Sequence, residues 1–69
     1  MEMVLHLRFE GKSFDVALGA LDVGSGSTDR EIKGAVAGYL DVAEARFRSY
    51  VVERHENGNI TVRPEAVFG

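Results

Sequence analysis

Few residues in this chain could bind a metal ion or transfer a proton. It has two histidines, His6 and His55, and no cysteine. A metal site needs several His, Asp, Glu or Cys side chains within reach of one ion. Both histidines are predicted to lie on strands and to face solvent. We therefore expect two ordinary surface histidines, with no metal ion and no other cofactor.

Nucleophilic catalysis finds no support in the sequence. The serines fall in predicted loops or turns, and no G-x-S-x-G motif holds one of them as a nucleophile. The stretch Gly24–Ser27 precedes a predicted helix, whose free N–H groups could attract a phosphate. It lacks the lysine of a P-loop, and Asp29 and Glu31 already place negative charge at that helix end. We expect a flexible connection there and a protein that is not an enzyme.

The last residue, Gly69, suggests a different chemistry, because a C-terminal glycine carboxylate can be activated and joined to sulfur or to another protein. Residues 64–69 follow the last predicted strand, and Pro64 is expected to end regular pairing because it lacks a backbone N–H. Two interpretations stay open. The tail is either free and reactive, or held against the core by Val67 and Phe68, and we favour the second.

Two hairpins and one helix are predicted to position these residues. Apolar and polar side chains alternate over 3–9 and again over 14–18, which is the period of half-buried strands. A two-residue turn at Gly11-Lys12, with glycine first, would be of type II′. That turn predicts the cross-strand pairs Phe9 with Phe14, Leu7 with Val16, Leu5 with Leu18, and Arg8 with Asp15.

A single long helix is predicted over 29–40. Thr28 can cap it while Glu31 reaches back to the Thr28 N–H, which is a capping box. The apolar residues that follow at spacings of three and four predict the buried face. They are Ile32, Ala35, Val36, Tyr39 and Leu40. The opposite face carries only small side chains, which a partner's backbone could approach closely. Its residues are Gly34, Ala37 and Gly38.

The second hairpin is predicted over 50–55 and 59–63. A two-residue Asn-Gly turn would mix polar and apolar side chains on each face of the hairpin. A three-residue turn with Gly58 in the left-handed region instead pairs Val52 with Val62 and separates the two faces. We therefore prefer the three-residue turn. The connection 41–49 before this hairpin is expected to hold a short helical turn at 43–46, with Val42 and Phe47 entering the core.

Hairpin, helix and hairpin together predict one α+β domain over 1–69. Its ββαββ order favours a mixed four-stranded sheet, with the first and last strands parallel in the centre. The helix then packs across one face and covers the apolar side of all four strands. The other face is predicted to be open and mostly polar.

This arrangement resembles the ubiquitin-like β-grasp superfamily. The resemblance is carried by the hairpin MEMVLHLRFEGKSFDVAL, by the helix capped by Thr28, and by the stretch LDVAEARFRSYVV. It implies a β-grasp fold and, in relatives that act through their C-termini, protein modification or sulfur carriage. Those relatives end in Gly-Gly, whereas this chain ends in Phe68-Gly69. The predicted open face also lacks the apolar patch of ubiquitin.

Composition limits the class of partner. The net charge of −3 disfavours nucleic acid, which binds clearly basic surfaces. Apolar runs are too short for a membrane span. The absence of cysteine suits a reducing compartment. We expect a cytoplasmic monomer that binds a protein partner, rather than nucleic acid or a membrane.

Three functions follow as hypotheses. We favour a small non-catalytic ubiquitin-like protein-interaction module. The alternative is a protein modifier or sulfur-carrier-like protein that acts through the Gly69 carboxylate, and the second alternative is an accessory subunit of a larger complex. The candidate partner surface combines the small-residue helix face with arginines of the C-terminal half. It consists of Gly34, Ala37, Gly38, Arg48, Arg54 and Arg63.

Overall fold

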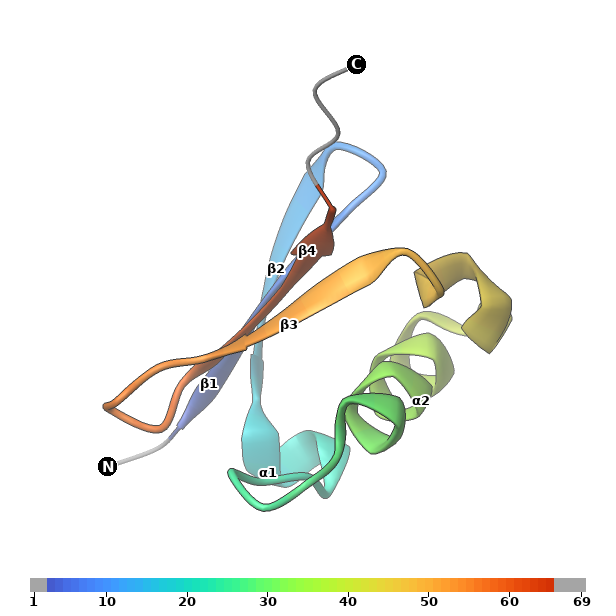
Figure 1. Ribbon diagram of the computed structural model, residues 1–69. Coiled ribbons are helices and arrows are strands. Elements are labelled where there is room, and N and C mark those ends of the chain that lie inside the picture. The colour runs from blue at the N-terminus through green and yellow to red at the C-terminus, as the bar shows by residue number, and fades with distance from the viewer. Residues whose placement is uncertain (1–2, 66–69) are drawn as a thin grey trace.

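The computed structural model describes residues 3–65 of the chain. Its elements are β1 (Val4–Phe9), β2 (Lys12–Ala17), α1 (Leu18–Leu21), α2 (Asp29–Leu40), the 3₁₀ helix η1 (Glu44–Phe47), β3 (Tyr50–Arg54) and β4 (Ile60–Pro64). The strands form one sheet in the order β2-β1-β4-β3 (Figure 1). The central strands β1 and β4 are parallel, and the outer strands pair antiparallel with them. The predicted α+β class and mixed four-stranded sheet are confirmed.

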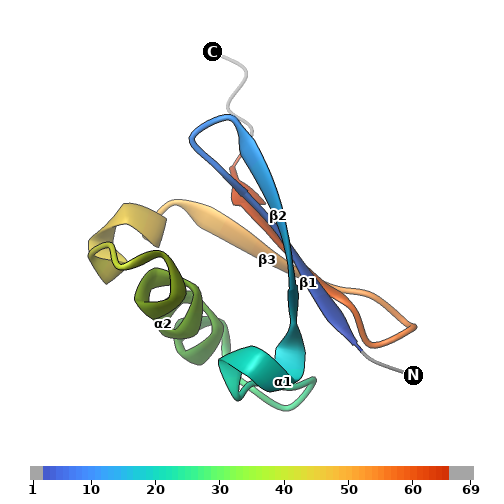
Figure 2. The same cartoon turned by 180° about the vertical axis from the view of Figure 1, so that it is seen from behind.

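The helices lie on one side of this sheet. Figures 1 and 2 show α1, α2 and η1 together on that side, while the other face is uncovered. Alternate residues of the strands point toward the helices and form the core with them, as the alternation over 3–9 predicts. The buried apolar residues are Leu5, Leu7, Phe9, Val16, Leu18, Ile32, Val36, Ala37, Phe47, Ile60 and Val62.

The β1–β2 turn differs from the predicted one. Its two central residues are Glu10 and Gly11, with φ of 51° and 77°, and Phe9 pairs with Lys12. Positive φ at both positions makes it a type I′ turn, whose twist suits the hairpin. The predicted type II′ turn at Gly11-Lys12 is therefore wrong, and the predicted register is wrong by two residues. Because side chains alternate with a period of two, the faces were still assigned correctly.

The changed register gives different cross-strand neighbours. Leu7 lies opposite Phe14, and Leu5 lies opposite Val16. Arg8 faces Ser13 rather than Asp15, which instead faces His6. Leu18 therefore lies outside the strand and begins α1, a short helix that was not predicted.

The β3–β4 hairpin has the predicted form. Gly58 has a φ of 94° within the three-residue turn, and Val52 lies opposite Val62. Strand β4 ends at Pro64, one residue later than predicted: Pro64 lies opposite Tyr50, and the Glu65 N–H still donates to the Ser49 carbonyl over 3.2 Å. The turn also meets the start of β1: the Val4 N–H donates to Asn59 Oδ1 over 3.0 Å. The predicted register of this hairpin is confirmed.

Helix α2 begins with the predicted capping box. The Glu31 N–H donates to Thr28 Oγ1 over 3.1 Å, and the Thr28 N–H donates to Glu31 Oε1 over 2.8 Å. The bond from the Thr28 backbone stabilises the ionised carboxylate and lowers the pKa of Glu31. The helix bounds Asp29–Leu40 are those predicted.

The buried side of α2 is rotated from the predicted one. Ile32 and Val36 are buried as expected, but Ala37 is only 1% exposed and Tyr39 is 55% exposed. The assignment of Tyr39 to the core and of Ala37 to an outer face was therefore wrong. η1 packs against α2, and its Glu44 approaches the helix at Gly34, one turn before Ala37.

Phe47 anchors η1 to the core. Its side chain is 0% exposed, and its ring centroid lies 5.1 Å from Phe9 and 4.8 Å from Tyr50. Burial among these rings raises the pKa of Tyr50. Arg46 lies over the Phe9 ring at 5.0 Å and pairs with Glu10 at 2.9 Å. The predicted helical turn and the role of Phe47 as a core residue are confirmed.

Candidate functional site

A groove runs along α2 where η1 packs beside it. It has a volume of about 520 Å³ and is lined by Asp29, Arg30, Lys33, Glu44, Ala45 and Arg48. The capping box at Thr28 fixes where α2 starts, and the burial of Phe47 fixes η1. The residues that line this α2–η1 groove therefore belong to two elements whose positions are fixed by the helix cap and by the buried Phe47.

Positive charge exceeds negative charge in the α2–η1 groove. Asp29 is compensated by Arg54, whose Nη1 lies 2.7 Å from Asp29 Oδ1. Arg30, Lys33 and Arg48 form no ion pair with any residue in the range 3–65. Glu44 is then the one lining carboxylate without such a partner in that range. The groove is thus a cationic site on a chain whose net charge is −3.

Gly34 lets Glu44 lie close to α2. A methyl group added at Gly34 would come within 2.6 Å of Glu44 Oε1. The close approach that we expected a partner's backbone to make at the small-residue face is thus made by the chain's own η1. Of the three residues predicted on that face, Ala37 is buried and Gly38 remains exposed. They do not form one open surface.

A second hollow adjoins the groove. It has a volume of about 420 Å³ and shares Arg30 and Glu44 with the α2–η1 groove. Its lining combines the partly buried Leu21, Val23 and Ala35 with the carboxylates of Asp22, Glu31 and Glu44. The surface along α2 therefore changes from cationic near Arg48 to acidic and partly apolar near Leu21.

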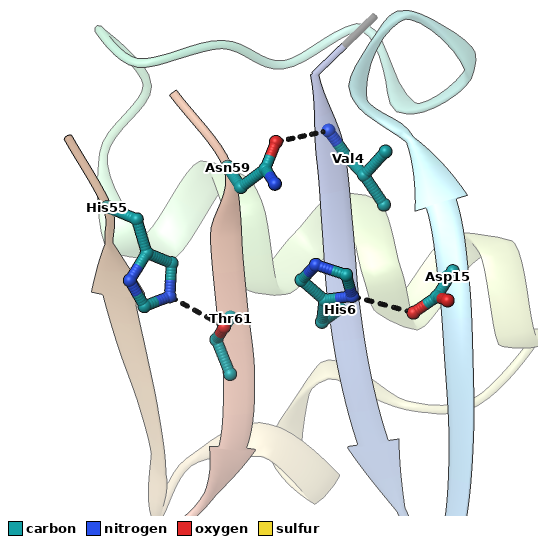
Figure 3. Close-up of polar contacts among 6 residues, drawn as sticks. All are labelled: Val4, His6, Asp15, His55, Asn59 and Thr61. Atoms are coloured by element: carbon teal, nitrogen blue, oxygen red, sulfur yellow. Dashed lines mark hydrogen bonds and ion pairs between the residues drawn. The ribbon is translucent and has the colours of Figure 1, made fainter. Parts of the chain in front are cut away.

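The open face of the sheet carries polar side chains that pair with one another. His6 Nδ1 lies 2.7 Å from Asp15 Oδ1, and His55 Nε2 lies 2.8 Å from Thr61 Oγ1 (Figure 3). His6 and Thr61 are opposite each other on the parallel strands β1 and β4. These four residues form a row that crosses the sheet from β2 to the end of β3.

Arg63 and Glu53 add an ion pair to the same face. Arg63 Nε donates to Glu53 Oε1 over 2.7 Å. This hydrogen bond and the opposite charge lower the pKa of Glu53 and raise the pKa of Arg63. Two of the arginines predicted for a partner surface, Arg54 and Arg63, are therefore engaged within the fold.

Metal binding has no ready-made site in the part of the chain that the structure describes. No group of at least three His, Asp or Glu side chains there could hold an ion. The two histidines lie on opposite sides of β4, and each is paired with a neighbour. Their geometry is that of a hydrogen-bonded surface row.

The structure brings together only part of the predicted partner surface. Arg48 lines the α2–η1 groove, and Arg54 lies beside it through Asp29. Arg63 is on the open face of the sheet, away from both. Sequence reasoning missed Arg30, Lys33 and Glu44. The spacing of Arg30 and Lys33 on one helix side was a signal for the first two, whereas the position of Glu44 depends on how η1 folds back.

Gly69, with Val67 and Phe68, lies outside the described residues. The expectation that its carboxylate is a conjugation site stays a prediction, as does the expectation that Val67 and Phe68 pack against the core.

No helix in the range 3–65 is long and apolar enough to cross a membrane. Comparison with known proteins adds no identity: no family model, no curated protein and no solved structure gives a match to this chain.

Proposed function

We propose that this protein is a non-catalytic, ubiquitin-like β-grasp module that binds another protein along α2 and η1. The observation that carries the proposal is the contrast between paired and unpaired charges. Arg46, Arg54 and Arg63 are held in ion pairs, whereas the cations of the α2–η1 groove have no such partner within residues 3–65. A cationic groove on an acidic protein favours a partner with a complementary acidic surface.

The β-grasp identity is part of the proposal. It is supported by the strand order β2-β1-β4-β3, the parallel central pair and one main helix across the sheet. Many functions use such a fold, so the binding role depends on the groove rather than on the topology.

The test is capture of a partner with matched variants. The protein, Arg48→Glu and Arg8→Glu are each immobilised and exposed to extract from the cells that make the protein. Arg8 is exposed on the open face, so its variant makes the same charge change at another place. We expect mass spectrometry to identify a protein that binds the unchanged protein and Arg8→Glu but does not bind Arg48→Glu.

Identical capture by all three baits would contradict the proposal. The same experiment addresses the modifier hypothesis, since intact mass reports any covalent conjugate of the chain recovered from cells. A conjugate that is lost in Gly69→Ala would favour the modifier over the binding module.

A further inference from the structure

Strand β3 is an outer strand of the sheet, and one of its edges has no strand beside it in the described part of the chain (Figure 1). The hydrogen bonds to β4 show which groups this edge presents. The His55 N–H donates to the Asn59 carbonyl, and bonded pairs alternate along an antiparallel ladder. Tyr50, Val52 and Arg54 therefore turn their N–H and C=O groups away from β4, toward the open edge.

The open edge of β3 lies beside the α2–η1 groove. Arg54, at one end of β3, pairs with Asp29, which lines the groove. Arg48, which also lines the groove, comes shortly before Tyr50 at the other end of β3. A segment that lies along this edge would therefore have the cations of the groove on its helix side.

We propose that an extended acidic segment of a protein partner adds to the sheet as a further strand along β3. This inference rests on the proposed function and names the form that the bound segment takes. The backbone of the segment pairs with the outward N–H and C=O groups of β3, and its alternate side chains point to the helix side. Carboxylates there complement the three cations of the groove, which have no ion pair within residues 3–65.

A second copy of the chain suits this edge less well. Tyr50 and Val52 pack against the core, and Arg54 reaches Asp29, so these three side chains lie on the helix side of β3. If two β3 strands paired antiparallel, the same three side chains would come from the partner copy. None of them is acidic, so this pairing would leave the cations of the groove unmatched.

The opposite edge of the sheet does not offer the same match. Strand β2 leads into α1, beside the second hollow. That hollow carries the carboxylates of Asp22, Glu31 and Glu44, which disfavour an acidic segment. The edge of β2 is therefore an internal comparison, and its amides should not respond to an acidic peptide.

The experiment adds synthetic peptides to the ¹⁵N-labelled protein and records hydrogen exchange at its amides. The first peptide alternates glutamate with threonine, and the second alternates lysine with threonine. We expect the first peptide to slow exchange at Tyr50, Val52 and Arg54, because their N–H groups become hydrogen-bonded. The amides of Val51 and Glu53 already face β4 and should change less. The lysine peptide should protect none of them.

Two N-methylated forms of the glutamate peptide test the strand geometry. A methyl group replaces the amide hydrogen of every glutamate in one form and of every threonine in the other. In an added strand only one of these alternate sets faces β3. We therefore expect one form to lose binding and the other to keep most of it.

Charge variants then test the groove. We expect Arg48→Glu to weaken the glutamate peptide by about tenfold, because the charge reversal turns attraction into repulsion. Arg8→Glu makes the same charge change on the open face and should leave the dissociation constant unchanged. Circular dichroism of each variant checks that the fold is intact.

Four outcomes would overturn the inference: no slowed exchange along β3, equal effects of the two N-methylated forms, binding that does not depend on Arg48, or a dimer in sedimentation that protects the same amides without peptide. The last outcome would mean that a second copy occupies the edge. If the peptides fail while Arg48→Glu still loses the cellular partner, only this inference falls. If neither binding event depends on Arg48, the proposed function falls as well.

Discussion

The two faces of the sheet are built from alternate residues of the same strands, yet their side chains interact in different ways. On the covered face, Leu7 and Val62 are at most 1% exposed and contact other apolar groups. On the open face, His6, Asp15 and Arg63 form hydrogen bonds and ion pairs that remain in contact with solvent. One strand register thus produces both an apolar core and a polar surface.

The difference separates what holds the fold from what is left for binding. Each fully buried aliphatic or aromatic side chain stabilises the fold by about 1.5–3 kcal/mol, whereas an exposed ion pair contributes about 0–1 kcal/mol. The open face pairs His6 with Asp15 and Glu53 with Arg63, and it leaves Arg8 without an ion pair in the range 3–65. The α2–η1 groove instead gathers three cations without such pairs in that range, which is why we propose binding there.

The largest effect is expected from Phe47→Ala on the covered side. Phe47 is 0% exposed and joins η1 to Phe9 and Tyr50, so its loss leaves a cavity among them. We expect a loss of about 3–5 kcal/mol in the free energy of unfolding, measured by urea denaturation. A loss below about 1 kcal/mol would show that the aromatic cluster does not hold the layers together.

A smaller effect is expected from Gly58→Ala in the β3–β4 turn. Gly58 has a φ of 94°, and a methyl group there would come within 2.6 Å of Met3 Sδ. Because Met3 is flexible, most of the cost comes from the backbone, and we expect a loss of about 1–2 kcal/mol by urea denaturation. Gly38→Ala, in an exposed helical position with open space, is the control and should be neutral or stabilising.

On the open face, Asp15→Asn is expected to change stability little. The variant keeps the shape of the side chain and removes the charge that faces His6, in a pair whose members are both substantially exposed. The expected loss is below about 0.5 kcal/mol by thermal and urea denaturation. A loss comparable to that of Phe47→Ala would mean that the row on the open face holds the sheet together, and the comparison of the two faces would fail.

The ion pair of Glu53 predicts a small dependence of stability on pH. Its folded pKa is lowered from the ordinary value of 4.5 by Arg63. The pair therefore stabilises the fold fully above about 4.5, and this contribution is lost as the pH falls through the folded pKa. Unfolding curves of Glu53→Gln should accordingly depend less on pH below 4.5 than those of the unchanged protein. Glu56→Gln, in the turn, is the matched control and should follow the unchanged protein.

The two hairpins show how far turn chemistry can be predicted from sequence. The register of β3 and β4 was predicted because a shift of one residue would have mixed polar and apolar faces. The register of β1 and β2 was not, because a shift of two residues leaves both faces unchanged. In the structure the turn is centred on Glu10 and Gly11, with Glu10 in a left-handed conformation. Residues other than glycine adopt that conformation less readily, so the sequence favoured a turn with glycine first.

The helix shows a similar limit. The bounds of α2 and its cap were predicted from Thr28 and Glu31, which act locally. Which side is buried depends on the packing of the whole fold: Ala37 is buried and Tyr39 exposed, and η1, a separate segment, packs against α2 near Gly34. Of the groove residues, only Arg48 was predicted, since the groove exists only after η1 has folded against α2.

The central pair of the sheet has a consequence for how the protein is made. β1 spans Val4–Phe9 and β4 spans Ile60–Pro64, so the two strands that meet in the middle leave the ribosome first and last. Until β4 has emerged, one edge of β1 has no strand to pair with, and Leu5 and Leu7 lack Ile60 and Val62. We therefore expect the domain to fold only after β4 has been made, with one edge of β1 unpaired until then.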